Sequence, residues 1–128
     1  ALQLRDVKKN IFFPGLLGLF GGGIEKGETA LMAIKREVQE ELNIDIKSPE
    51  LFLKTNIYSK KFKNPFRERS YYTYKINKRI KDQIKLNEGK AILFKNFKDI
   101  DGKKFAPWDY QAIQFHQCIE KKVFFNKA

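Results

Sequence analysis

The chain has 128 residues, of which 42% are hydrophobic and 14% aromatic, and a formal net charge of +11. This length predicts one domain over residues 1–128, and the charge predicts attraction to nucleotides, nucleic acid or acidic membranes without choosing among them. One cysteine and one histidine exclude an internal disulfide bond and a structural Cys/His zinc site. Because no apolar run could span a bilayer and no signal-peptide pattern opens the chain, we expect a soluble, cytoplasmic protein without a membrane partner.

The first residues predict two short strands and a glycine-rich turn. Residues 1–5 alternate apolar and polar positions, as in the second half of a strand, and residues 16–20 form a short apolar strand. Between them, residues 6–15 suit a loop with a buried phenylalanine anchor. Three glycines at 21–23 end the second strand, and they allow positive φ and close approach of a ligand to the backbone.

An amphipathic helix is predicted next, with Thr29 as its N-cap and its end near Leu42. At about 100° per residue, one side of this helix carries an apolar stripe. The stripe comprises Ala30, Leu31, Ile34, Val38 and Leu42. Asn43 follows the last turn, where it can adopt the left-handed conformation that ends a helix.

Three further strands and a second helix are predicted after this one. The strands cover residues 51–59, 70–76 and 91–97, with a basic loop at 60–69 and a turn at 87–89. Pro107 suits the first turn of the second amphipathic helix. Strands combined with two amphipathic helices imply an α/β fold with a sheet covered on both faces.

Three glutamates, Glu37, Glu40 and Glu41, fall within one turn of the first predicted helix. Relative to the centre of the apolar stripe, Glu41 falls inside it, Glu37 on its edge and Glu40 farther round. Burying a carboxylate costs free energy unless its negative charge is compensated. Bound Mg²⁺ or Mn²⁺ would compensate that charge, and these ions commonly bridge carboxylates to phosphates. Arg36, four residues before Glu40, can pair with Glu40 or with Glu28 and so compensates part of this charge. The alternative to a metal site is an intrahelical salt-bridge network of Lys35, Arg36, Glu37, Glu40 and Glu41.

The stretch from 22 to 44 resembles the signature of the Nudix hydrolases, and we identify the chain as similar to small MutT-like bacterial members. Eight of nine specified positions match: Gly22, Glu28, Arg36, Glu37, Val38, Glu40, Glu41 and Ile44. Asn43 stands where the family has glycine. Residues 16–25, 87–94 and 106–109 also resemble stretches of these proteins. The resemblance implies an α/β/α sandwich with a mixed sheet between helices, whose usual first strand is missing or trimmed here.

The resemblance also implies metal ligands and a reaction. Glu37, Glu40 and Glu41 would hold Mg²⁺ or Mn²⁺, with the backbone carbonyl of Gly22 as a further ligand. The implied reaction is attack by a metal-activated water on the diphosphate linkage of a nucleoside diphosphate joined to a group X, such as a nucleoside triphosphate or a nucleotide sugar.

Other roles follow from the same resemblance. Arg36 and Glu28 would orient the helix carboxylates. Glu37 is the default general base, and Glu88 is the candidate for a second acid or a further metal ligand. A turn residue exposed before a strand is the alternative interpretation of Glu88.

Substrate selection is expected outside the signature. Arg67 and Arg69 can hold phosphates, and Tyr72 and Trp108 can stack on a base, although such side chains often only solvate the surface or fill the core. Two other functions stay open: an RNA 5′-end pyrophosphohydrolase, favoured by the basic charge, and a non-catalytic sensor that binds nucleotides. A homodimer stays open as well.

Overall fold

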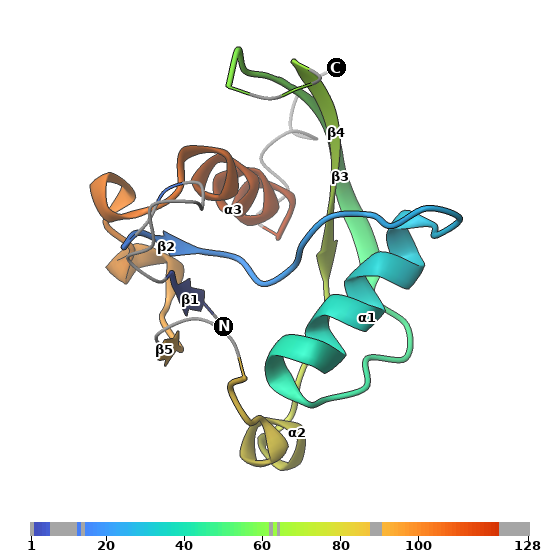
Figure 1. The fold of residues 1–128 in the computed structure, drawn as a ribbon. Coiled ribbons are helices and arrows are strands. Elements are labelled where there is room, and N and C mark those ends of the chain that lie inside the picture. Colours follow the sequence, from blue (N-terminus) through green and yellow to red (C-terminus); the bar gives the residue numbers. More distant parts are fainter. Residues whose placement is uncertain are drawn as a thin grey trace, which may run out of the picture.

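The computed structural model describes residues 2–5, 13, 15–61, 63, 65–87 and 91–120 (Figure 1). In chain order its strands and helices are β1 (Leu2–Leu4), β2 (Leu17–Gly18), α1 (Ala30–Leu42), β3 (Glu50–Tyr58), β4 (Phe66–Thr73), α2 (Lys78–Gln83), β5 (Ala91–Leu93), the 3₁₀ helices η1 (Phe97–Asp99) and η2 (Gly102–Lys104), and α3 (Pro107–Glu120). This combination of helices and sheets confirms the α/β class. No helix in these ranges is long and apolar enough to cross a membrane.

The strands form two antiparallel sheets. β1 lies between β2 and β5. β3 and β4 form a long hairpin whose last cross-strand pair is Tyr58 with Phe66. An isolated parallel bridge joins Leu17 to Phe105, which ties β2 to the segment before α3. In the view of Figure 1, α3 lies on one side of the hairpin and α1 on the other.

Two apolar clusters hold these elements together. Val38 and Leu42 of α1 pack with Ile44 and Ile46, and Ile34 and Phe20 lie against them. Leu2, Leu17 and Phe105 form the second cluster, beneath the start of α3. The segment from Gly18 to Gly23 leaves β2 in the second cluster and passes the first one at Phe20. It therefore runs between the two halves of the fold.

The ends of α1 agree with the sequence-based prediction. The Thr29 side chain accepts a hydrogen bond from the Met32 backbone N–H at 3.1 Å, and Asn43 adopts φ 56° and ψ 31° after the last turn. The apolar stripe is wrong at Leu31, which is 43% exposed. Leu31 lies in the first turn of α1, which extends past the apolar cluster around Val38. Its side chain is therefore not part of that cluster, although it falls on the apolar stripe of the helix.

Several other boundaries needed correction. The predicted basic loop at 60–69 is wrong from Phe66 onward, because residues 66–69 pair with 55–58 as part of β4. Phe66, Arg67 and Glu68 are all exposed in this strand end, so charged residues do not prevent pairing there. The third predicted strand ends at Leu93, and α2 was not predicted; Asn77 caps that short helix by accepting from the Ile80 N–H at 2.9 Å.

Some predictions fall on residues that are only partly described. Within the predicted loop at 6–15, Phe13 is half-buried and its ring lies edge-on to Trp108, with centroids 5.3 Å apart. In the predicted turn at 87–89, only Asn87 is described. Its side-chain amide donates to the Glu40 backbone carbonyl at 2.8 Å, at the end of α1. Glu88 lies outside the described residues.

Candidate active site

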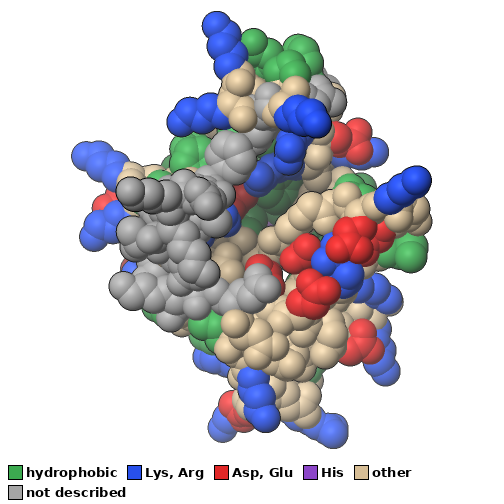
Figure 2. Space-filling view, viewed as in Figure 1, with side chains coloured by type: hydrophobic (Ala, Val, Ile, Leu, Met, Phe, Trp, Pro, Cys, Tyr) green, Lys and Arg blue, Asp and Glu red, His purple; other side chains and the backbone are tan. Residues whose placement is uncertain are grey.

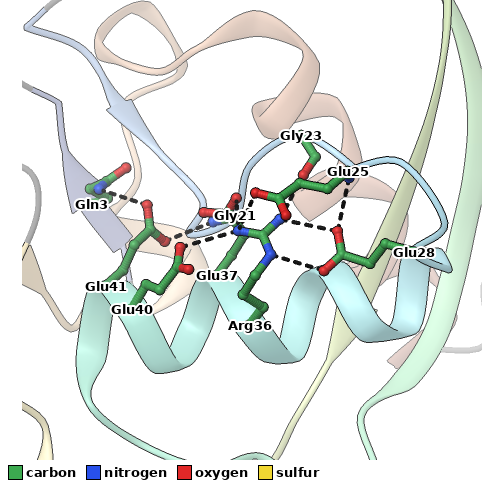
Figure 3. A network of polar contacts seen from close by, with 9 residues as sticks. All are labelled: Gln3, Gly21, Gly23, Glu25, Glu28, Arg36, Glu37, Glu40 and Glu41. Carbon is green, nitrogen blue, oxygen red and sulfur yellow. Dashed lines mark hydrogen bonds and ion pairs between the residues drawn. The ribbon is translucent and has the colours of Figure 1, made fainter.

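Acidic side chains gather on the surface over α1 (Figure 2), and Arg36 is at the centre of this group (Figure 3). Its Nε and Nη2 atoms donate to the two carboxylate oxygens of Glu28 at 2.8 and 3.1 Å. Its Nη1 atom donates to Glu37 at 2.8 Å and to Glu40 at 3.1 Å. Nη2 also donates to the Gly23 backbone carbonyl at 2.9 Å. The two pairings predicted as alternatives, with Glu28 and with Glu40, therefore both occur.

These contacts shift the pKa values of Arg36 and Glu28. Hydrogen bonds to Glu28 and Glu37 raise the pKa of Arg36 above its usual range. The hydrogen bond from Arg36, with help from the Glu25 N–H, holds the pKa of Glu28 below its usual value of 4.5. One guanidinium thus faces four carboxylates, those of Glu28, Glu37, Glu40 and, at 3.9 Å, the exposed Glu25, and the network keeps a net negative charge that would attract a cation.

The three helix glutamates differ in exposure as their angles around the helix predicted. Glu41 is 4% exposed, whereas the side chains of Glu37 and Glu40 are 15% and 52% exposed. The buried Glu41 carboxylate accepts a hydrogen bond from the Gly21 N–H at 2.9 Å and a longer one from Gln3 at 3.5 Å. The chain's own donors thus offset part of the cost of burying this carboxylate.

Gly22 lies directly against Glu37. A Cβ atom built on Gly22 would be 2.3 to 2.7 Å from the carboxyl atoms of Glu37, closer than such atoms approach in proteins. At Gly23 the same Cβ would meet nothing within 4 Å. The glycine at position 22 is therefore needed for the close approach of the helix carboxylate to the backbone.

A second group of functional side chains surrounds Asp109 in the first turn of α3. Asp109 is buried, and its Oδ2 atom accepts a hydrogen bond from the Leu19 N–H at 3.0 Å. Its Oδ1 atom lies 3.4 Å from both Arg69 Nη1 and the Tyr71 hydroxyl. The Arg69 guanidinium lies 5.1 Å from the centre of the Trp108 ring. Burial and the nearby Asp109 charge raise the pKa of Tyr71, so its hydroxyl stays protonated.

A pocket of about 230 Å³ opens beside this group, between the β3–β4 hairpin and α3. Its lining residues are Leu53, Thr55, Asn56, Ile57, Tyr58, Tyr71, Trp108, Gln111 and Ala112. Apolar walls with a few amide and hydroxyl groups are typical of small-molecule sites. The pocket is therefore a candidate binding site for part of a substrate.

The predicted substrate-binding residues fall into two sets. Trp108 lines the pocket, and the Arg69 guanidinium lies over the Trp108 ring without lining the pocket itself. Arg67 is exposed, two residues earlier on the same face of β4 as Arg69. Tyr72 points to the opposite face from Tyr71, because successive strand residues alternate, and it does not line the pocket. Asp109 was not predicted as a site residue, and its only signal in the sequence was its place in residues 106–109, before the helix.

One short segment connects the two groups. Asp109 holds the backbone of Leu19 and Glu41 holds that of Gly21. Two residues of extended chain span at most about 7 Å. The buried carboxylates of Asp109 and Glu41 are thus anchored at neighbouring points of one short segment.

Among the residues described, no three acidic, histidine or cysteine side chains converge as a ready metal site. The oxygens that could bind a metal are turned instead toward Arg36, in the case of Glu37 and Glu40, and toward the Gly21 N–H, in the case of Glu41. The residues nevertheless fit a hard divalent cation in their chemistry. They offer three carboxylates on one helical turn, beside a glycine whose missing Cβ leaves room for Glu37.

Comparison with known protein families agrees with this site. The NUDIX domain family matches residues 2–114, a range that contains the Arg36 network, the pocket and most of α3. No curated protein matches the chain. Proteins with this domain are hydrolases of phosphoric anhydrides and act on nucleoside diphosphate derivatives. The resemblance inferred from residues 22–44 is therefore confirmed, and the chain belongs to the Nudix family.

Proposed function

We propose that the protein hydrolyses the diphosphate linkage of a nucleoside diphosphate joined to a group X, with Mg²⁺ or Mn²⁺ held by Glu37, Glu40 and Glu41. The observation that carries this proposal is the contact between Gly22 and the Glu37 carboxyl group, which no other residue at position 22 would permit. It sets a carboxylate beside the exposed backbone of a glycine turn, where a phosphate can approach.

A divalent cation bound at these carboxylates would neutralise phosphate charge, lower the pKa of a bound water and stabilise the leaving phosphate. The protein's own residues fix where this happens. Arg36 holds Glu37 and Glu40 from one side, and Glu28 in turn holds Arg36. We propose the Gly22 backbone carbonyl as a further ligand.

Glu37 is also our candidate for the general base. It is the least exposed of the three carboxylates that form ion pairs with Arg36 Nη1, and it lies against the glycine turn. Glu88 stays a proposed second acid or ligand. Its neighbour Asn87 is tied to the C-terminal end of α1 by a hydrogen bond from its N–H to the Glu41 carbonyl, at 2.8 Å.

We assign the nucleoside to the pocket beside α3. The Trp108 ring and the Ile57 side chain offer apolar contact, while the Gln111 amide can donate and accept hydrogen bonds to a base. Arg69, over the Trp108 ring, is our candidate for a cation that binds the phosphates. Asp109, which lies beside Trp108 and Tyr71, and Glu41 hold the same short segment at Leu19 and Gly21, which supports one ligand that uses both the pocket and the carboxylates of α1.

A panel of substrates tests this proposal. Nucleoside triphosphates, nucleotide sugars and RNA with a 5′-triphosphate would each be incubated with Mg²⁺ and with Mn²⁺, and the products identified. We expect at least one mononucleotide derivative to be cleaved at its diphosphate, and the Glu41→Gln variant to lose this activity while remaining folded by thermal unfolding. Full activity of that variant would refute the metal assignment, and turnover of RNA far above every mononucleotide would make RNA the substrate. Nucleotide binding without any turnover would favour a sensor.

A further inference from the structure

The end of the β3–β4 hairpin exposes two aromatic rings. Tyr58 and Phe66 are 54% and 64% exposed, and they face each other across the last pair of the hairpin with ring centroids 5.1 Å apart. A hydrogen bond of 2.8 Å from the Ser59 N–H to the Pro65 carbonyl closes the chain just beyond them. Two large rings held together at an exposed tip, rather than packed inside, suggest a surface that meets a partner.

The same tip is strongly basic. Lys60, Lys61 and Lys63 are exposed, and within the described ranges no acidic group lies in ion-pair distance of them. The acid nearest in the strand, Glu68, is engaged by Lys54 at 3.0 Å. Figure 2 shows lysine and arginine side chains around the end of the hairpin, at the top of the view, whereas the acidic side chains gather over α1. The tip is thus aromatic and positively charged at once.

We propose that this hairpin tip, defined by Tyr58, Lys60, Lys61, Lys63 and Phe66, binds single-stranded nucleic acid. Surfaces that bind single strands combine aromatic rings, on which bases stack, with cations that follow the phosphates. A duplex keeps its bases stacked on one another and offers none to the rings. The tip has the combination that a single strand requires.

A membrane fits this surface less well. Residues at alternate positions share a face of a strand, so Glu68 and Asn56 lie on the same face as Phe66 and Tyr58. An anionic lipid surface pressed against the rings would meet the half-exposed Glu68 carboxylate. A single strand can follow the rings and the lysines without covering that carboxylate.

The tip is also next to the pocket, because Tyr58 lines it together with Trp108. The two rings lie on the opposite face of the hairpin from Ile57 and Tyr71, so a nucleic acid stacked on them would pass around the end of the hairpin to reach the site assigned to the substrate nucleoside. This last step rests on the proposed function, whereas binding at the tip does not. The test below measures binding alone, so that the two can fail separately.

The experiment is fluorescence anisotropy with a labelled oligouridine of about 12 nucleotides. The oligomer carries a 5′-hydroxyl and the buffer contains EDTA, so that hydrolysis plays no part. We expect the double variant Tyr58→Ala/Phe66→Ala to bind at least about tenfold more weakly than the parent chain. Leu51→Ala/Phe94→Ala is the matched control, since it removes two other exposed apolar side chains, and it should bind as the parent does. The Glu41→Gln variant should also bind normally.

The lysines are tested by the salt dependence of binding. Replacing Lys60, Lys61 and Lys63 with serine should reduce the slope of log K against log salt by about 2, because each phosphate contact on a single strand contributes roughly 0.7. The control replaces Lys95, Lys98 and Lys103, which lie after β5, and loses the same charge. Thermal unfolding checks that every variant is folded.

Three results would overturn the proposal. Equal affinity for a duplex would exclude stacking on the rings. An equal effect of both lysine triplets, with no effect of the ring variant, would mean general attraction to a chain of charge +11. Binding to phosphatidylserine vesicles but not to the oligomer would identify the tip as a membrane contact.

Discussion

Glu41, in the last turn of α1, accepts a hydrogen bond from the backbone N–H of Gly21 at 2.9 Å. This bond fixes the glycine turn to the helix that carries the other two glutamates. Two residues earlier, the Leu19 N–H is fixed to α3 through Asp109 at 3.0 Å. The backbone between Leu19 and Gly21 is thus held from both sides, which sets Gly22 against Glu37.

The first prediction concerns this contact. Gly22→Ala would push the Glu37 carboxyl group away from the turn, because the new Cβ would lie within 2.7 Å of it. A displacement of about 1 Å at a catalytic group can cost roughly 100-fold in rate, and we expect a loss of that size in kcat. The flexible end of Glu37 can move, so the free energy of unfolding should change by less than about 1 kcal/mol.

Gly23→Ala is the matched control, since a Cβ at that position meets no atom within 4 Å. It should keep both its activity and its unfolding midpoint. Steady-state kinetics and denaturant unfolding of the two variants measure the difference. Equal activities would show that the Gly22 contact does not position Glu37.

The second prediction concerns Arg36. Arg36→Lys keeps the charge but loses the planar fork that reaches Glu28, Glu37 and Glu40 at once. Substitution of a residue that orients metal ligands typically lowers metal affinity or activity by about 10 to 100 fold, and we expect the affinity for Mn²⁺ to fall in that range. Mn²⁺ titration by calorimetry measures the affinity.

The same substitution at Arg79, an exposed residue of α2, serves as the control and should bind Mn²⁺ normally. If Arg36→Lys bound the ion more tightly instead, Arg36 would be a competitor for the carboxylates. The proposal that Arg36 holds the carboxylates in place for the metal would then be wrong.

The third prediction concerns the pH dependence of stability. Arg36 holds the pKa of Glu28 below 4.5, so the folded state favours the ionised carboxylate. The stabilisation is fully present above pH 4.5 and is lost as the pH falls through the lower pKa of the folded state. Wild type should therefore unfold at a higher temperature than Glu28→Gln near neutral pH, and the difference should shrink below pH 4.5.

Thermal unfolding of both proteins, from about pH 7 down to about pH 3, measures this difference. A difference in unfolding midpoint that stayed constant over the whole range would show that Glu28 acts by packing or as a neutral acceptor. The charge of the Glu28 carboxylate would then make no contribution to the stability of the folded state.

The fourth prediction concerns the pocket. Trp108→Leu removes the ring that lines the pocket and faces Arg69, and stacking on a base is worth about 1–3 kcal/mol. We expect KM for the preferred nucleotide to rise about tenfold or more, with a smaller change in kcat. Tyr72→Leu is the control, because Tyr72 lies outside the pocket. Equal kinetic effects of the two substitutions would show that the nucleoside does not bind in this pocket.

Local patterns predicted the features of α1 that depend on the helix alone. The order of exposure of Glu41, Glu37 and Glu40 follows from angles around one helix, and the caps at Thr29 and Asn43 follow from local backbone chemistry. Leu31 failed because its burial depends on how far the neighbouring cluster extends, which the helix pattern does not contain.

Features made by distant segments could not be predicted in this way. Asp109 owes its role to Leu19, which is 90 positions away in the chain. The early start of β4 at Phe66 depends on its partner strand, because the sequence of a water-exposed hairpin end looks like a loop. The pocket likewise needs β3, β4 and α3 together.

The central claim is that the carboxylates beside the glycine turn carry a divalent cation and perform the hydrolysis. The most direct measurement is the Mg²⁺-dependent rate of nucleotide hydrolysis by Glu37→Gln, compared with Glu50→Gln, which changes an exposed glutamate at the start of β3. We predict a loss of roughly 100-fold or more for Glu37→Gln, the range typical of a lost general base, and full activity for Glu50→Gln. Equal, undiminished rates for the two variants would contradict the claim.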